Sequence, residues 1–127
     1  MKVFKCEVCG NIIEKVIDKG VPVMCCGKPM VELTANTSDG ALEKHVPVAA
    51  VKDGQLEVVV GSVEHPMLAE HYITNVWAVA GNQVLRAELK PGEAPKAVFA
   101  LGDYKGTVEV YEYCNLHGLW KNEIEIN

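Results

Sequence analysis

Alternating apolar and polar positions dominate the chain after residue 40 and predict β-strands. Between residues 71 and 80, Tyr72, Thr74, Val76 and Ala78 would share one face of a strand, with the intervening residues on the other. Similar segments recur at roughly even spacing, and the only helical signal is a short turn at 41–45. The predicted strands are 46–51, 55–61, 71–80, 84–89, 97–101, 107–113 and 119–126. Such a series of short strands favours an all-β fold with an antiparallel sandwich of the immunoglobulin type.

Two dipeptides mark tight connections between these strands. Asp53-Gly54 separates the first predicted strand from the second, and Gly81-Asn82 separates the third from the fourth. Both combine residues that accept the backbone conformations of two-residue hairpin loops. Neighbouring strands at these positions are therefore expected to pair antiparallel.

The first 36 residues follow a different pattern. Only Lys2–Lys5 and Ile12–Val16 have strand character, and glycine and proline interrupt the rest. A segment this short cannot build a sufficient apolar core and needs a staple such as a bound metal. A polar stretch at 35–40 is interpreted as a linker. We therefore expect a small metal-stapled domain over 1–36 and the sandwich over 37–127.

Composition narrows the class of protein. The 127 residues carry a net charge of −5 and include no lysine- or arginine-rich run, which argues against a nucleic-acid partner. Uninterrupted apolar stretches reach about five residues, far below the ~20 needed to span a membrane. The first residues lack the apolar core of a signal peptide. A cytoplasmic location is expected, where clustered cysteines more often hold metal than form disulfides.

Four of the five cysteines lie in the N-terminal segment and are here called the four-cysteine set: Cys6, Cys9, Cys25 and Cys26. Two residues between Cys6 and Cys9 allow both thiolates to reach one ion, and a tetrahedral sulfur site suits zinc or a single iron. Adjacent Cys25 and Cys26 can join them only if the backbone bends sharply, which predicts a distorted site. A structural zinc knuckle and a pair of disulfides remain as alternatives, and spacing does not choose between iron and zinc.

The remaining cysteine and all the histidines form a second group, here called the histidine–cysteine set: His45, His65, His71, Cys114 and His117. A single histidine is more often a hydrogen-bonded side chain than a ligand. Here every histidine lies in a loop or at a strand end, and Cys114 and His117 form a local chelating pair. Five ligands exceed the usual four of zinc but suit six-coordinate iron with one open position. A thiolate ligand would push electron density onto the iron, which favours reduction chemistry.

With these motifs the chain resembles the desulfoferrodoxins, the two-iron form of superoxide reductase, over essentially its whole length. The matching motifs are Cys6-x2-Cys9-x15-Cys25-Cys26, Glu43-Lys44-His45-Val46-Pro47, His65-Pro66-Met67 with Glu70-His71-Tyr72-Ile73, and Cys114-x2-His117-Gly118-Leu119-Trp120. The resemblance implies a desulforedoxin-like domain followed by an immunoglobulin-like barrel. It also implies one iron in the four-cysteine set, where zinc could substitute, and a second iron in the histidine–cysteine set.

The resemblance further implies an activity and partners. The second iron would lie in the plane of four imidazoles with Cys114 on the axis, and superoxide would meet its open sixth position. One-electron reduction would give hydrogen peroxide without dioxygen. A rubredoxin-like protein would supply electrons, and the protein would be a homodimer.

Glu43 and Lys44 are the expected catalytic residues on the same grounds. In the family the residue at Glu43 binds ferric iron after turnover, and Lys44 would attract superoxide and organise water. One cation at the site matters because the whole chain is negative. Without the resemblance this pair would be interpreted as a solvated loop. Two other functions stay open from sequence: a non-catalytic iron electron-transfer protein, and a zinc-stabilised immunoglobulin-like binding module.

Overall fold

A computed structural model describes all 127 residues. Its contacts divide the chain into two compact units, Met1–Thr34 and Ala35–Asn127, each of which is described by itself. The boundary expected from the sequence, between residues 36 and 37, stays a prediction. The fold is all-β with antiparallel sheets, as the sequence predicts. Its one helix has four residues, so no helix of the structure could cross a bilayer.

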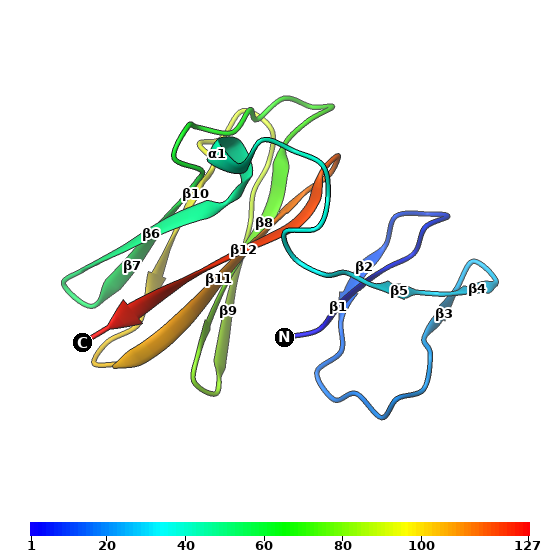
Figure 1. Cartoon of the computed structure of the whole chain (residues 1–127), viewed down its shortest axis with the longest axis horizontal. Helices are drawn as coiled ribbons and strands as arrows, with labels where there is room; N and C mark the ends of the chain where they lie inside the picture. Colours follow the sequence, from blue (N-terminus) through cyan, green and yellow to red (C-terminus); the bar gives the residue numbers. More distant parts are fainter. The chain divides into compact units, whose positions relative to one another are not determined.

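The first unit contains five very short strands (Figure 1). They are β1 (Val3–Lys5), β2 (Ile12–Glu14), β3 (Met24–Cys25), β4 (Lys28–Pro29) and β5 (Val31–Glu32). A three-stranded sheet has the order β2-β1-β5, and β3 pairs with β4 as a separate hairpin. The sequence patterns indicated β1 and β2 but not the three later strands. Strands of two residues are too short to produce a detectable alternation.

The second unit is a sandwich of two antiparallel sheets. Its elements are α1 (Leu42–His45), β6 (Pro47–Lys52), β7 (Gln55–Val60), β8 (Ile73–Ala80), β9 (Gln83–Glu88), β10 (Lys96–Ala100), β11 (Gly106–Cys114) and β12 (Gly118–Ile126). One sheet has the order β10-β7-β6 and the other β12-β11-β8-β9. The seven strands match the predicted segments within a few residues. The immunoglobulin-like sandwich is therefore confirmed.

Both predicted hairpins are present. Lys52 pairs with Gln55, and Asp53 and Gly54 between them both have positive φ, of 53° and 74°. That backbone is the two-residue turn that the right-handed twist of paired strands favours. Ala80 similarly pairs with Gln83 across the second turn.

The core of the second unit lies between its two sheets. β7 alternates strictly, with Leu56, Val58 and Val60 fully buried, and β11 contributes Val108 and Val110. The side chains that line this core are apolar, so their removal from water stabilises the sandwich without any bound group. The sandwich can therefore support a site at its end without depending on it.

One irregularity lies where the sandwich meets the candidate site. The β8–β11 register shifts by one residue, so that Tyr113 pairs with Asn75 while Cys114 pairs with Ile73. The extra residue, Thr74, donates its hydroxyl hydrogen bond to the Tyr113 carbonyl. As a result Ile73, which the simple alternation places opposite Val76, is fully buried in the core with it. Such bulges commonly re-aim side chains beside functional sites.

Candidate metal centres

The four-cysteine set comes together around two tight turns. Cys6 directly follows β1. Cys9 lies in the next turn, in which the Gly10 N–H donates to the Cys6 carbonyl. Cys25 is the last residue of β3 and Cys26 the first residue of the β3–β4 turn, with φ of 53°. Left-handed backbone at Cys26 supplies the sharp bend that adjacent cysteines require if both are to face one point.

The sulfur atoms of this set are close enough for one ion. All four lie within 4.8 Å of one another, and the Cys9 and Cys25 sulfurs are 3.7 Å apart. Tetrahedral sulfur ligands at ~2.3 Å from a metal are separated by ~3.8 Å. All five cysteines are free thiols, so the disulfide alternative is not realised. The set fits a single tetrahedral ion.

Hydrogen bonds already favour a thiolate at one of these cysteines. The backbone N–H of Cys9, 3.4 Å from the Cys6 sulfur, is the main cause that lowers the pKa of Cys6 to about 6. The crowded neighbouring sulfurs, Cys9 foremost, raise the pKa of Cys26 to about 12. Four thiols this close cannot all ionise without a cation, which again indicates a metal.

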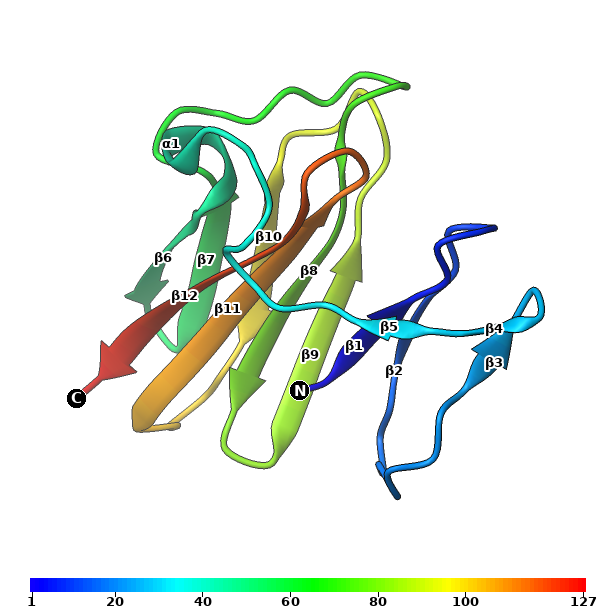
Figure 2. The ribbon, with the colours of Figure 1, turned by 45° about the vertical axis from the view of Figure 1, so that its right-hand side comes forward.

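The histidine–cysteine set gathers at one end of the sandwich. α1, the loop between β7 and β8, and the β11–β12 turn all lie at that end (Figure 1, Figure 2). His45 ends α1, His65 and His71 lie in the loop, and Cys114 and His117 flank the turn. The five candidate ligand atoms lie within 4.8 Å of one another.

Backbone hydrogen bonds hold these three segments together. The Glu43 carbonyl accepts the Val63 N–H at 2.8 Å, which joins α1 to the loop. The Asn115 side chain accepts the Tyr72 N–H at 2.9 Å and donates to the Glu70 carbonyl at 3.1 Å, which joins the turn to the loop. Gly61 allows the close approach to α1, since a Cβ there would lie 2.7 Å from the Glu43 carbonyl oxygen.

The four imidazoles form a ring of nearly perpendicular neighbours. In the order His45, His65, His71, His117, consecutive ring centroids are 4.7, 4.7, 5.0 and 4.8 Å apart, with interplanar angles of 74–86°. The His45–His71 diagonal is 6.4 Å. Four similar sides and a longer diagonal describe a closed ring of imidazoles around one point.

For three of the rings the structure also shows which nitrogen faces that point, which the sequence could not. His45 and His65 direct Nδ1 at the carbonyls of Ala41 and Pro66, at 2.8 and 2.7 Å, so these nitrogens carry the proton. Their Nε2 atoms therefore carry lone pairs and face each other at 3.2 Å. His117 instead directs Nδ1 inward, 3.1 Å from His45 Nε2.

These nitrogens have the chemistry of a ligand set rather than of a hydrogen-bond network. Two lone pairs 3.2 Å apart repel unless a cation lies between them. His71 Nε2 is buried with no hydrogen-bond partner at all. Burial lowers the pKa of His65 to about 4 and also lowers the pKa of His45 and of His71. Burial thus favours the neutral form of these three rings, which is the form that binds metal.

Cys114 supplies the sulfur from the buried side. Its side chain is completely buried and packs in the core of the sandwich, with its sulfur 3.8 Å from His117 Nδ1. Burial raises the pKa of Cys114, while backbone N–H groups of Leu116 and His117 lower it. Ionisation in this position therefore needs a metal. Four imidazoles and one cysteine sulfur fit iron better than a four-coordinate zinc.

The expected catalytic pair lies beside this set but not in it. Glu43 and Lys44 are exposed on α1, immediately before buried His45. The pKa of His71 is lowered mainly by burial and further by the charges of His117 and Lys44, so the Lys44 charge acts on one of the candidate ligands. The catalytic roles expected for Glu43 and Lys44 stay a prediction.

One side chain near the site escaped the sequence analysis. Glu112 is fully buried, and neither of its carboxylate oxygens has a hydrogen-bond partner. Its position in the register could have revealed it, because it lies in phase with buried Val110 and Cys114 on β11. Trp120, the last residue of the Cys114 motif, stacks on His45 with ring centroids 5.0 Å apart.

Comparison with known proteins agrees with this geometry. Residues 37–123 match the family model for desulfoferrodoxin, and residues 1–33 match the model for its N-terminal domain. The desulfoferrodoxin of Syntrophotalea carbinolica is 46% identical over 123 residues, which cover 97% of this chain and 96% of that protein. A superoxide reductase of Thermococcus kodakarensis is 34% identical over 114 residues, covering 76% of this chain and 99% of the relative.

Solved structures give the same result. The crystal structure of the superoxide reductase from Treponema pallidum superposes with a TM-score of 0.79 at 36% identity and covers 95% of this chain and 97% of that one. The one-iron superoxide reductase from Giardia intestinalis has a TM-score of 0.58 at 33% identity, covering 66% of this chain and 99% of that one. With both family models matched along nearly its whole length and both ligand sets assembled, this chain belongs to the desulfoferrodoxin family.

Proposed function

We propose that this protein is a superoxide reductase that uses the histidine–cysteine set as its active site and the four-cysteine set as a second iron site. One observation carries the proposal: five neutral or ionisable soft donors from three separate segments converge on one point, with nitrogen lone pairs that face one another. Iron bound there supplies one electron, so that superoxide and two protons become hydrogen peroxide without dioxygen.

The protein groups around the site have distinct tasks. Backbone N–H groups of Leu116 and His117 favour the thiolate form of Cys114, which opposes the effect of burial on its pKa. Protonated Nδ1 atoms on His45 and His65 fix the rings so that Nε2 points inward. These contacts hold the ligand atoms before the metal arrives, so little reorganisation accompanies binding.

Substrate reaches the site from the side where protein ligands are exposed. His71 and His117 are partly exposed, whereas Cys114 is buried. We place the open face at these exposed rings, with Lys44 on the exposed surface of α1 beside His45. Because the chain carries a net charge of −5, this ammonium group offsets a general repulsion of superoxide. We assign to Glu43, its exposed neighbour, the task of holding the oxidised iron at the same face.

The reaction itself distinguishes this function from electron storage. Superoxide generated enzymatically or by pulse radiolysis is supplied to the iron-loaded protein with an external reductant, and peroxide and dioxygen are both measured. A reductase gives one peroxide per superoxide and no dioxygen. Failure to consume superoxide faster than its spontaneous decay would support the non-catalytic carrier, and a colourless zinc-only preparation after growth with iron would support the binding module.

The role of Lys44 needs a charge-matched control. Lys44→Ala should lower the second-order rate constant for superoxide at low salt, and Lys44→Arg should restore most of it. Lys52→Ala is the control, because Lys52 ends β6 at the hairpin, at the other end of the strand from His45, and carries the same charge. Equal rates for Lys44→Ala and Lys52→Ala would exclude local steering.

Three further features belong to the proposal. A rubredoxin-like one-electron carrier reduces the iron, the chain forms a homodimer, and the protein acts in the cytoplasm. Free thiols that serve as ligands suit a reducing compartment. Sedimentation of the iron-loaded protein measures its mass directly, and a monomer at micromolar concentration would contradict the dimer. Reduction of the ferric protein by a purified rubredoxin, followed at its visible bands, tests the donor.

A further inference from the structure

His45 is held on every side that does not face the other ligands. Its Nδ1 donates to the Ala41 carbonyl at 2.8 Å, and its ring stacks against Trp120 with an interplanar angle of 29°. Only 2% of the His45 surface is exposed. The two partly exposed histidines, His71 and His117, have no such tryptophan cover. His45 is therefore more constrained than either of these rings.

Trp120 contacts a second candidate ligand as well. Its indole Nε1–H donates to the His117 carbonyl at 3.0 Å, within the β11–β12 turn. The side chain is 1% exposed and belongs to β12, which pairs with β11 along its whole length. One rigid side chain thus touches two histidines that are 72 positions apart and whose inward nitrogens lie 3.1 Å from each other.

Gly40 closes the remaining side. A Cβ on this residue would lie 3.1 Å from His45 Cε1, 3.1 Å from Trp120 Cζ2 and 3.2 Å from His45 Nδ1. Such distances are tighter than ordinary van der Waals contact. Glycine lets the backbone pass against the edges of both rings, whereas a Cβ here would require the rings to shift slightly, and no positive φ is involved at this position.

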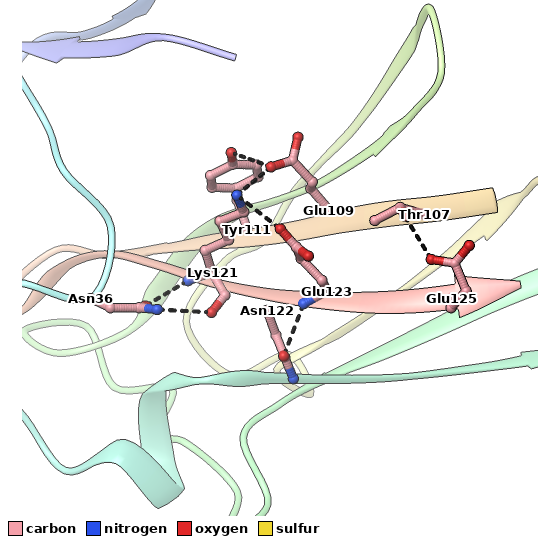
Figure 3. Close-up of polar contacts among 8 residues, drawn as sticks. All are labelled: Asn36, Thr107, Glu109, Tyr111, Lys121, Asn122, Glu123 and Glu125. Carbon is pink, nitrogen blue, oxygen red and sulfur yellow. Dashed lines mark hydrogen bonds and ion pairs between the residues drawn. The ribbon is translucent and has the colours of Figure 1, made fainter.

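The segment that carries Gly40 is itself anchored. We call residues 36–41 the strap. At its start the Asn36 side chain accepts the Lys121 N–H at 2.8 Å and donates to the Lys121 carbonyl at 3.1 Å, which attaches the strap to β12 (Figure 3). At its end the Ala41 carbonyl accepts the His45 ring and two backbone N–H groups of α1. Trp120, which lies on β12, and the strap, which is attached to β12, thus both pack against His45.

We propose that Trp120 and Gly40 are positioning residues that fix the plane of the His45 ring and its distance from His117, and thereby set the metal affinity and ligand field of the histidine–cysteine set. Ring orientation matters because a ligand lone pair must point at the ion. Outer-shell partners that orient histidines typically change metal affinity ~10–100-fold when altered. The inference rests on the proposed function only in taking this set as a metal site.

We call Trp120 and Gly40 together the clamp. Cobalt(II) binding to the full chain tests their positioning role without reference to catalysis. Trp120→Leu removes both the stacking face and the N–H donor and should weaken Co²⁺ binding to the histidine–cysteine set ~10–100-fold and shift its visible ligand-field bands. Trp120→Phe keeps a stacking face and should have a smaller effect. The four-cysteine set in the same molecule is an internal reference whose affinity should not change.

Gly40→Ala covers the case in which Trp120→Leu fails to fold. The added methyl group should displace the His45 ring and shift the same bands, whereas Asp39→Ala at the exposed neighbouring position should not. Trp77→Phe is the matched control for Trp120→Phe, because Trp77 is also buried, at 4% exposure, but makes no contact with the histidine rings. Wild-type affinity and bands in both Trp120→Leu and Gly40→Ala would refute the clamp, as would equal effects of Trp77→Phe and Trp120→Phe.

The two proposals fail in different ways. A wild-type protein that binds Co²⁺ at both sets but does not reduce superoxide would defeat the proposed function and leave the clamp intact. Normal superoxide reduction with unaltered Co²⁺ spectra in the variants would defeat the clamp alone.

Discussion

The two units use metal ligands in opposite ways. In the first unit the apolar core consists of Phe4, Cys6 and Met30, with Cys25 packed against it, so two candidate ligands form part of the core itself. In the second unit the core contains fourteen buried residues, of which only Cys114 is a candidate ligand. The metal therefore completes the fold of the first unit, whereas the fold of the second unit prepares a site for the metal.

This difference follows from size. A unit of 34 residues with strands of two or three residues cannot bury enough apolar surface to offset the entropy of ordering its chain. The sandwich of 93 residues can, and it has room to hold unfavourable groups such as facing lone pairs and an unpartnered carboxyl group. The first unit is therefore stable only when its ligand set holds a metal. In the second unit the stable sandwich holds the ligand set in place.

The largest expected effect is that of removing the metal from the first unit. Cys9→Ser, which alters an exposed ligand, should release that metal and abolish ordered structure in residues 1–34, because structural metal sites contribute ~10–16 kcal/mol to folding. Hydrogen exchange should show rapid exchange there and full protection in β8 and β11. If the amides of β1 and β5 were protected from exchange without metal, the first unit would not need its metal to fold. Unchanged turnover of this variant with an external donor would show that the first iron is not an obligatory electron relay.

The matching change in the second unit should remove activity but not structure. Cys114→Ser replaces the sulfur in a completely buried position, at a cost of ~1–3 kcal/mol for a buried hydroxyl group. Superoxide reduction and the thiolate absorption of this site should both be lost, by more than the ~10–100-fold typical of altered outer-shell partners. Thermal unfolding monitored by circular dichroism gives the stability. If the Cys114→Ser protein showed no cooperative unfolding, the fold of the second unit would also depend on its ligands.

A smaller effect should come from the buried carboxyl group of the sandwich. Burial raises the pKa of Glu112 to about 9 from an ordinary value of 4.5, so the folded state holds a proton that the unfolded state releases. Its contribution is therefore complete below pH 4.5 and is lost as the pH rises toward 9. The Glu112→Gln side chain cannot ionise. Between pH 5 and 9 the free energy of unfolding of this variant should therefore fall by about 1–3 kcal/mol less than that of the wild type.

Glu109→Gln on the same strand is the control with the opposite sign. Glu109 forms an ion pair with Lys121 and accepts from the Tyr111 hydroxyl (Figure 3), and the Lys121 contact lowers its pKa. Its contribution is present above pH 4.5 and is lost on acidification. Denaturant unfolding across pH 4–9 measures both variants, and parallel profiles would contradict the assignment of either group.

The smallest effect is expected from a surface charge of the first unit. The Gly20 N–H, followed by the Lys2 and Lys15 ammonium groups, lowers the pKa of Asp18. The carboxylate thus adds stability above its ordinary pKa of 3.8, and this is lost as the pH falls. Asp18→Asn should lower the thermal midpoint of the metal-loaded unit slightly at pH 7 and less at pH 3. A change as large as that of Cys9→Ser would mean that metal is not the main support of this unit.

The sequence by itself determined much of the molecule. Period-two alternation located the seven strands of the sandwich, since one face of each is buried, and Asp53-Gly54 determined a hairpin through its backbone preference. Ligand types and spacing separated the two metal sets, because no other cysteine or histidine exists in the chain. Among the strands, the alternation of apolar and polar residues failed to indicate only β3, β4 and β5, which have two residues each.

Tertiary structure decided how the ligands meet. The His45 and His65 rings are oriented by carbonyls that their Nδ1 atoms reach, and His45 Nε2 then lies 3.1 Å from His117 Nδ1, 72 positions away along the chain. The Trp120 contacts with His45 and Gly40 join β12 to segments that are distant along the chain. Such contacts depend on sheet register and loop packing, which no periodicity of the sequence encodes, and they determine the orientation of a ligand whose presence the sequence had already indicated.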